Sequence, residues 1–242
     1  MAEAAAKTAG AEVLSVSDLQ AWYGESHILH GINFNVKAGE VVTLLGRNGA
    51  GKTTTLKSVM GIIGKRTGSI RFNGQDITRT SSDKIARQGI AFCPEERGIF
   101  ASLDVRENLL LPPIVRAGGL SLDQIFDLFP NLKERLNSQG TKLSGGEQQM
   151  LAIARILRTG ARFLMLDEPT EGLAPVIIQQ IGHTIARLKS EGFTILLVEQ
   201  NFRFASTVAD RYYIVEHGKV IDGFANADLQ ANMDKLHTYL GV

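Results

Sequence analysis

The sequence predicts an α/β protein built on a mostly parallel β-sheet that is covered by helices on both faces. Residues 41–45, 163–166 and 194–198 are almost uniformly apolar, as strands buried on both faces of such a sheet are. Segments with helical spacing follow these strands, and an alternation of strands and helices is typical of this fold class. Ligands bind beyond the carboxyl ends of the strands in such sheets, so polar residues that follow them are candidate site residues.

The first ninety residues add further strands and two helices. Residues 13–23 and 28–36 alternate partly between apolar and polar side chains and predict two strands, and residues 69–72 predict a third that ends in the hairpin signal Asn73-Gly74. These segments form the N-terminal antiparallel β subdomain that we expect. Helices are predicted at residues 54–63 and 80–88, and a short buried strand at residues 89–93. Residues 64–68 are expected to interrupt the pattern of helices and strands.

The middle of the chain has a different character, because residues 103–157 contain no convincing strand. Asp104 is a plausible N-cap for a helix over residues 105–111, which Pro112-Pro113 ends. Short helices are predicted at residues 121–128 and 132–137. We therefore expect a helical subdomain, about residues 96–158, inserted in the α/β core.

The α/β pattern returns after residue 161. Helices are predicted at residues 174–190 and 202–209, and two strands at residues 212–215 and 219–222 flank the turn His217-Gly218. The tail from Ala225 predicts two short helices. Residues 12–242 are thus expected to form one domain, preceded by a flexible leader at residues 1–11.

Composition excludes several classes of function. The chain has 242 residues, of which 44% are hydrophobic and 21% charged, and its net charge of +1 argues against a broad nucleic-acid surface. The five histidines lack metal-ligand spacing, and Cys93, the only cysteine, is expected to be a buried hydrophobe. No run of apolar residues approaches a membrane span and the start of the chain is no secretory signal, so we expect a soluble cytoplasmic protein.

A phosphate-binding loop lies between the first buried strand and the helix that follows it. Residues 46–53 fit the pattern G-x-x-x-x-G-K-[ST], although a glycine-rich turn can match it by accident. Lys52 is expected to contact the β- and γ-phosphates of ATP, and the Thr53 hydroxyl to ligate Mg²⁺. The residues that we expect to bind the nucleotide here are Gly46, Asn48, Gly49, Ala50, Gly51, Lys52, Thr53 and Thr54.

Two acids follow the strand at residues 163–166. Asp167 fits the carboxylate that holds Mg²⁺, usually through water, in phosphate-loop enzymes. Glu168 is placed to polarise a water molecule for attack on the γ-phosphate. The alternative is that both acids are simply solvated at the end of a strand. The presence of a phosphate loop in the same chain disfavours this alternative.

A third signal is the segment Leu143-Ser144-Gly145-Gly146-Glu147-Gln148-Gln149. Ser144 and Glu147 form a capping box, which alone would indicate only a capped helix. The tandem glycines Gly145 and Gly146 leave backbone N–H groups open at the helix start, which makes a second anion site. Because one ATP already has a cradle, we expect the nucleotide to lie between two subunits.

These motifs together resemble the ATP-binding cassette (ABC) ATPases over about residues 13–242. Leu-Ser-Gly-Gly-Glu-Gln is the signature of that family, and it precedes Asp167-Glu168 as it does in the family. The resemblance implies a P-loop NTPase core and a head-to-tail dimer, with ATP between the phosphate loop of one subunit and residues 144–147 of the other. It also implies that Tyr23 stacks on adenine, although Tyr23 could be an ordinary strand aromatic.

Two positions depart from the family pattern. Glu95, after Pro94, stands where the family usually has a glutamine that touches Mg²⁺ and water, so Glu95 is a candidate metal ligand. Gln200 stands where the family usually has a histidine at the γ-phosphate. An amide can donate a hydrogen bond but takes up no proton at neutral pH, which favours Glu168 as the base. The catalytic candidates are therefore Lys52, Glu168 and Gln200.

The departures resemble one branch of the family. Pro94-Glu95, residues 171–175 and residues 198–201 are similar to the shorter ATPase subunit of importers for branched-chain or other hydrophobic amino acids. Importers of urea, amides or aromatic acids share much of this pattern. The resemblance implies a second ATPase subunit, two membrane permeases reached through a groove around residues 95–104, a periplasmic substrate-binding protein, and a location at the cytoplasmic face of the inner membrane.

Two other classes remain as alternatives. Some exporters of lipids use stand-alone cassettes of this size. ABC ATPases that act on nucleic acid or ribosomes usually carry long coiled coils or two cassettes, and this chain has one phosphate loop and no long heptad run.

Overall fold

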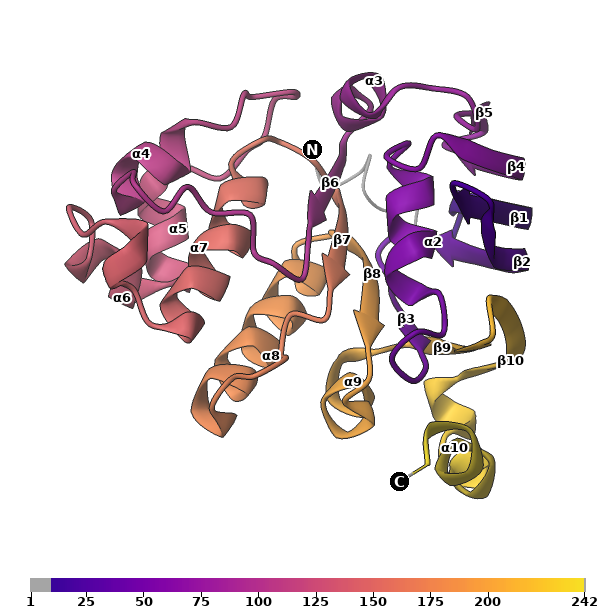
Figure 1. The fold of residues 1–242 in the computed structure, drawn as a ribbon. Coiled ribbons are helices and arrows are strands. Elements are labelled where there is room, and N and C mark those ends of the chain that lie inside the picture. The colour runs from indigo at the N-terminus through magenta and orange to yellow at the C-terminus, as the bar shows by residue number, and fades with distance from the viewer. Residues whose placement is uncertain (1–9, 242) are drawn as a thin grey trace.

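A computed structural model describes residues 10–241, which form two β-sheets with helices packed around them (Figure 1). The strands are β1 (Glu12–Tyr23), β2 (Ser26–Lys37), β3 (Val41–Leu45), β4 (Lys65–Phe72), β5 (Gln75–Asp76), β6 (Ile90–Cys93), β7 (Phe163–Asp167), β8 (Thr194–Glu199), β9 (Arg211–Glu216) and β10 (Lys219–Ala225). The helices are α2 (Lys52–Val59), α3 (Ser82–Arg87), α4 (Val105–Leu110), α5 (Leu122–Leu128), α6 (Pro130–Glu134), α7 (Gly145–Leu157), α8 (Pro175–Ser190), α9 (Phe202–Val208) and α10 (Met233–Leu240), with 3₁₀ turns at Gly140–Lys142, Asn226–Asp228 and Gln230–Asn232. The expected leader lies outside the described residues apart from Gly10 and Ala11.

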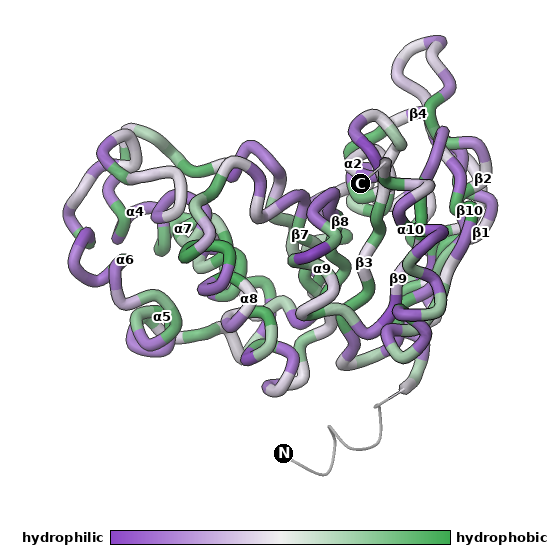
Figure 2. The backbone as a smooth tube through the Cα atoms, turned by 90° about the horizontal axis from the view of Figure 1, so that it is seen from below, coloured by the Kyte–Doolittle hydropathy of each residue, from purple (hydrophilic) through white to green (hydrophobic). Residues whose placement is uncertain are grey.

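The larger sheet is mostly parallel, which confirms the expected fold class. Its strand order is β10-β9-β3-β8-β7-β6, and only the edge strand β10 runs antiparallel to its neighbour. Every residue of β3, β7 and β8 is buried, because helices or the second sheet cover both faces. Figure 2 shows the apolar course of β3 through the interior.

Alternate residues of β7 enter different cores. Phe163 and Met165 pack on the face that also holds Leu56 of α2 and the apolar side chains of β1, β2 and β4. Leu164 and Leu166 point to the opposite face, where α7, α8 and α9 contribute the apolar side chains. This alternation is the expected period of two along a strand, and it leaves no solvated face on the central strands.

The smaller sheet is antiparallel, in the order β2-β1-β4-β5, and it confirms the expected N-terminal β subdomain. The expected interruption of secondary structure at residues 64–68 is wrong, because β4 begins at Lys65 and pairs with β1. Gly68 permits this course: its φ is +98°, and a Cβ atom there would lie 2.3 Å from the carbonyl oxygen of Asp18. Asn73-Gly74 forms the turn between β4 and β5, and both residues have positive φ (49° and 77°).

Helices α4 to α7 lie between β6 and β7 in the chain and stand to one side of the larger sheet in Figure 1. Asp104 caps α4 as expected, since its side chain accepts a hydrogen bond from the backbone of Glu107. Asn108 is fully buried and exchanges hydrogen bonds with the backbone N–H and carbonyl of Phe100 (2.8 and 2.9 Å), which closes the preceding loop. This segment corresponds to the helical insert expected at about residues 96–158.

Several element boundaries differ from the expectation. Helix α2 begins two residues earlier than expected and ends at Val59 instead of residue 63, because Gly61 (φ +72°) turns the chain there. Helix α6 begins at Pro130, a residue favoured at the first helical position.

Cys93 is buried at the end of β6 as expected, and burial raises the pKa of its thiol to about 12. Among residues 10–241 no helix is both long enough and apolar enough to span a membrane.

The carboxyl ends of β3, β7 and β8 lie side by side because the three strands are parallel neighbours. Leu45 at the end of β3 pairs with Glu199 at the end of β8, and Asp167 at the end of β7 pairs with Val198. Three segments far apart in the sequence therefore leave the sheet at one edge. These are the phosphate loop, Asp167-Glu168 and Gln200.

Candidate active site

The phosphate loop, residues 46–53, turns the chain from β3 into α2. Gly51 precedes the helix with a φ of +105°, which is strained for any residue with a side chain. Gly46 lies so close to the neighbouring strand β9 that a Cβ atom would stand 2.3 Å from the carbonyl oxygen of Val215. The loop thus presents backbone N–H groups at the start of a helix, where the helix dipole favours an anion.

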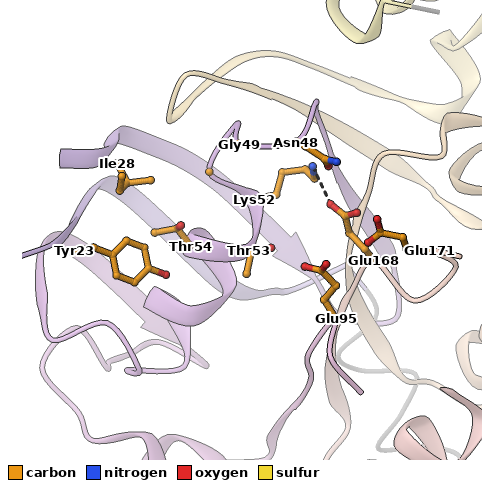
Figure 3. A pocket seen from close by; sticks show the side chains of 11 residues that line it. Tyr23, Ile28, Asn48, Gly49, Lys52, Thr53, Thr54, Glu95, Glu168 and Glu171 are labelled. Carbon is orange, nitrogen blue, oxygen red and sulfur yellow. Dashed lines mark ion pairs between the residues drawn. The ribbon is translucent and has the colours of Figure 1, made fainter. Parts of the chain in front are cut away.

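Lys52 is the centre of the loop and only 4% exposed. Its ammonium group donates to the carbonyl oxygens of Gly46 (2.8 Å) and Arg47 (3.1 Å). It also forms an ion pair with Glu168, with 3.0 Å between Nζ and Oε1 (Figure 3). A phosphate group bound on the loop would compete with Glu168 for the same ammonium.

Glu168 follows β7 in an unusual backbone conformation. Its φ is +44°, in the left-handed region that residues with side chains rarely occupy. Its N–H donates to the carbonyl oxygen of Val198 at 3.0 Å, so the parallel neighbour β8 holds the residue in this conformation. The side chain therefore points across the sheet edge towards the phosphate loop.

Thr53 and Asp167 meet beneath the cavity. The Thr53 hydroxyl donates to Oδ1 of Asp167 at 3.0 Å. Asp167 is 1% exposed, its Oδ2 has no hydrogen-bond partner, and burial raises the pKa of its carboxyl group to about 6. Oxygen ligands are the ones that Mg²⁺ prefers, and a nearby cation would offset the cost of burying this carboxylate. These two residues therefore fit a magnesium ion.

Three glutamates lie together on one side of the cavity. Glu95 and Glu171 stand beside Glu168 (Figure 3). The pKa of Glu95 is raised, first by desolvation and then by the negative charges of Glu171 and Glu168. Among residues 10–241 no group of three or more His, Cys, Asp or Glu side chains could hold a metal ion by itself. A magnesium ion here would therefore need oxygens from the nucleotide and from water as well.

The cavity has a volume of about 380 Å³, and Figure 3 shows it from close by. Tyr23 lies at the end opposite to the glutamates and is 48% exposed, so its ring is open to a stacking partner. Most of the residues that the sequence predicts for the site line this cavity. The lining residues are Tyr23, Ile28, Asn48, Gly49, Gly51, Lys52, Thr53, Thr54, Glu95, Glu168 and Glu171.

Several predicted residues stand outside the lining. Gly46, Ala50 and Asp167 lie in or beneath the loop, and Gln200 is exposed beyond the end of β8. Sequence reasoning missed Ile28 and Glu171. No local pattern marks Ile28, which lies on β2, far from the phosphate loop in the sequence. Glu171 stands three residues after Glu168, which was the available signal.

Residues 144–147 do not line the cavity. They begin α7, where Ser144 and Glu147 form the expected capping box. Partial burial opposes ionisation of Glu147, but the hydrogen bonds from Ser144 and the pairing with Arg135 lower the pKa of its carboxyl group. Gly146 packs against α8, since a Cβ atom there would meet Ile177 at 2.9 Å. Within one chain, the helix start at which we expect a second anion is thus separate from the cavity.

Known proteins resemble this chain over nearly its full length. The ABC transporter family matches residues 29–171. A high-affinity branched-chain amino acid transport ATP-binding protein, BraG, from Pseudomonas aeruginosa is 42% identical over 95% of this chain and 100% of its own length. A lipopolysaccharide export system ATP-binding protein, LptB, from Escherichia coli is 34% identical over 94% of this chain and 97% of its own length.

A solved structure shares the fold. It is a dimeric ATP-binding cassette in a post-hydrolysis state, bound to ADP and phosphate. Its TM-score to this chain is 0.78 at 23% identity, and the alignment covers 88% of this chain and 98% of that one.

The buried carboxylate of Asp167 yields a prediction about stability. In the presence of a chelator at pH 8, Asp167→Asn should raise the free energy of unfolding in urea by on the order of 1–3 kcal/mol, because it removes a buried charge. The gain should shrink as the pH falls from about 6 towards 4, where the raised pKa leaves Asp167 itself increasingly neutral. With Mg²⁺ and ATP present, the order of stability should reverse. A variant that is less stable than the original chain without metal at pH 8 would contradict this account.

Proposed function

We infer that this chain, which belongs to the ABC transporter family of ATPases, powers an importer of branched-chain or other hydrophobic amino acids. ATP hydrolysis coupled to transport is the activity of the family, and the single observation that supports it here is the convergence of Lys52 and Glu168 in one cavity with Tyr23 at its other end. The import of amino acids is the finer part of the proposal. It is supported by BraG, the more similar of the two named relatives.

The cavity explains how ATP would be bound. The adenine would stack on Tyr23, next to Ile28, and the phosphates would lie on the N–H groups of the phosphate loop. Lys52 would hold the β- and γ-phosphates. A magnesium ion held by Thr53 and Asp167, with Glu95 nearby, would supply electrostatic stabilisation of the phosphate charge.

Glu168 is the residue that we propose to orient and polarise the attacking water. In the structure its carboxylate is neutralised by Lys52. Once the γ-phosphate engages the ammonium, Glu168 is free to accept a hydrogen bond from water. Gln200 would donate a hydrogen bond to the γ-phosphate from its side-chain amide, and it takes up no proton.

A second cassette would complete the site. Residues 144–147 form a helix start that could bind an anion, and none of them lines the cavity of the same chain. We propose that they bind the ATP held by the phosphate loop of the second subunit, either a sister ATPase or another copy of this chain. The dimeric solved cassette supports this arrangement.

An apolar hollow would receive the membrane permeases. It has a volume of about 410 Å³ and lies between the α/β core and the helical insert. None of its lining residues falls within residues 95–104, where the sequence predicts the groove. Phe100, which lies in that range, is 48% exposed. An apolar helix of a permease subunit is the occupant that we propose. The lining residues are Met60, Ile62, Ser82, Asp83, Ala86, Ile90, Ala91, Phe92, Pro113, Val115, Ile156 and Thr159.

The remaining parts of the proposal follow from membership of an import system. The permeases would hold the chain at the cytoplasmic face of the inner membrane, and a periplasmic protein would deliver the substrate to them.

Export is the second candidate function, and the 34% identity to LptB supports it. Uptake of radiolabelled leucine by cells that depend on this chain separates the two: the proposal requires uptake that fails with an inactive chain, and unchanged uptake would contradict it.

The role of Glu168 predicts a loss of turnover without a loss of binding. Glu168→Gln should lower kcat for ATP hydrolysis by about 10²- to 10⁴-fold while ATP still binds. Glu171→Gln is the matched control, because it removes a carboxylate from the same side of the cavity. It should lower kcat far less. Equal losses in the two variants, or normal turnover in Glu168→Gln, would rule out the proposed role.

The hollow predicts a separate loss of membrane association. Ile62 is 51% exposed, so Ile62→Asp should fold normally but place a charge in the apolar hollow. The variant should no longer co-purify with permease subunits from membranes, whereas its own ATPase activity persists. Ile221→Asp, on β10 outside the hollow and 39% exposed, is the control and should co-purify normally. Retention of Ile62→Asp on the permeases would place the docking surface elsewhere.

A further inference from the structure

Glu199 is a buried acid that the proposed chemistry does not use. It is the last residue of β8 and only 2% exposed. None of the ion pairs among residues 10–241 involves it. Burial raises the pKa of its carboxyl group to about 7, against the effect of the hydrogen bonds that it accepts. Burying such a group costs free energy that an apolar residue would not, so its position requires an explanation.

The two oxygens of Glu199 contact two different loops. Oε1 accepts a hydrogen bond from the Thr170 hydroxyl at 2.8 Å. Oε2 accepts a hydrogen bond from the N–H of Asn201 at 3.2 Å. Thr170 stands two residues after Glu168, and Asn201 stands one residue after Gln200. One carboxyl group therefore joins the loop that carries the proposed base to the loop that carries the proposed phosphate contact.

Both loops need such an anchor. Glu168 has a left-handed backbone (φ +44°) that costs free energy unless its surroundings enforce it. Thr170 is 3% exposed and lies at the first turn after that residue. On the other side, Asn201 caps α9 by accepting a hydrogen bond from the N–H of Phe204 at 3.1 Å. The anchor of Asn201 thus also sets where α9 begins.

We propose that Glu199 is a positioning residue for ATP hydrolysis: its buried carboxyl group holds the loops after β7 and β8 together so that Glu168 and Gln200 face the same γ-phosphate. The inference rests on the proposed roles of these two residues. Glu199 does not line the cavity, so it acts through Thr170 and Asn201. A small displacement of either loop would misplace Glu168 relative to the water it orients.

The proposal predicts a split between kcat and KM. Glu199→Ala and Thr170→Val should each lower kcat for ATP hydrolysis by roughly 10- to 100-fold, with KM for ATP changed less than about threefold. Glu199→Gln and Thr170→Ser should keep kcat within about threefold, because each retains polar partners for the bridge. Thr184→Val is the matched control. Its hydroxyl is equally buried but donates to Gln180 within α8, so its loss should leave kcat unchanged.

The two ends of the bridge should also be coupled. The double variant Glu199→Ala/Thr170→Val should be no more than about twofold slower than the slower single variant, because both changes break the same bridge. Losses that multiply would overturn the proposal. So would a large rise in KM without a fall in kcat, or a full loss in the conservative variants.

Hydrogen exchange tests the bridge without relying on turnover. Thr170→Val should speed exchange at the amides of Asn201 and Phe204, whose N–H groups donate to Glu199 and Asn201, and Thr184→Val should not. Exchange confined to the loop of Thr170 would overturn the proposal even in a fully folded variant. If Glu168→Gln kept normal turnover, the role of Glu168 would fail, while the exchange result would still decide whether Glu199 joins the loops.

Discussion

The parallel alignment of β3, β7 and β8 is the constraint on which the site depends. Because the three strands end at one edge, Lys52 at the start of α2 comes within 3.0 Å of Glu168, more than a hundred residues later in the chain. Both side chains are almost fully buried, so each charge would be costly without the other. The uniformly apolar strands supply the burial that fixes this alignment. The same alignment places Asp167 beside the Thr53 hydroxyl and Glu199 between the loops that follow β7 and β8.

The fold separates the phosphate loop from the helix start at Ser144. The phosphate loop opens into the cavity with Tyr23 and Glu168, whereas Ser144 and the glycines after it begin α7 in the helical insert. A single chain thus carries the phosphate loop in the cavity and, elsewhere, the helix start that we propose to bind the nucleotide of a second subunit. The helical insert also shares the lining of the apolar hollow with the α/β core.

Local patterns were sufficient for much of this arrangement, and long-range pairing explains the rest. The phosphate loop, Asp167-Glu168 and the cap at Ser144 follow from residues adjacent in sequence, because their chemistry depends on a strand end or a helix start. Gly68 predicts a break when its neighbours alone are considered, but pairing with β1 carries the strand through it. The role of Glu199 could not be recognised from the sequence, since its partner Thr170 is brought to it only by the register of the neighbouring strands β7 and β8.

The central claim is that the ammonium of Lys52, now paired with Glu168, is the group that binds the ATP phosphates. Calorimetric titration of Lys52→Ala with ATP and Mg²⁺ tests it most directly, with Lys65→Ala as a control, since Lys65 is largely exposed outside the cavity. We expect an affinity roughly 10- to 100-fold weaker for Lys52→Ala and an unchanged affinity for Lys65→Ala. Unchanged affinity in a folded Lys52→Ala variant would contradict it.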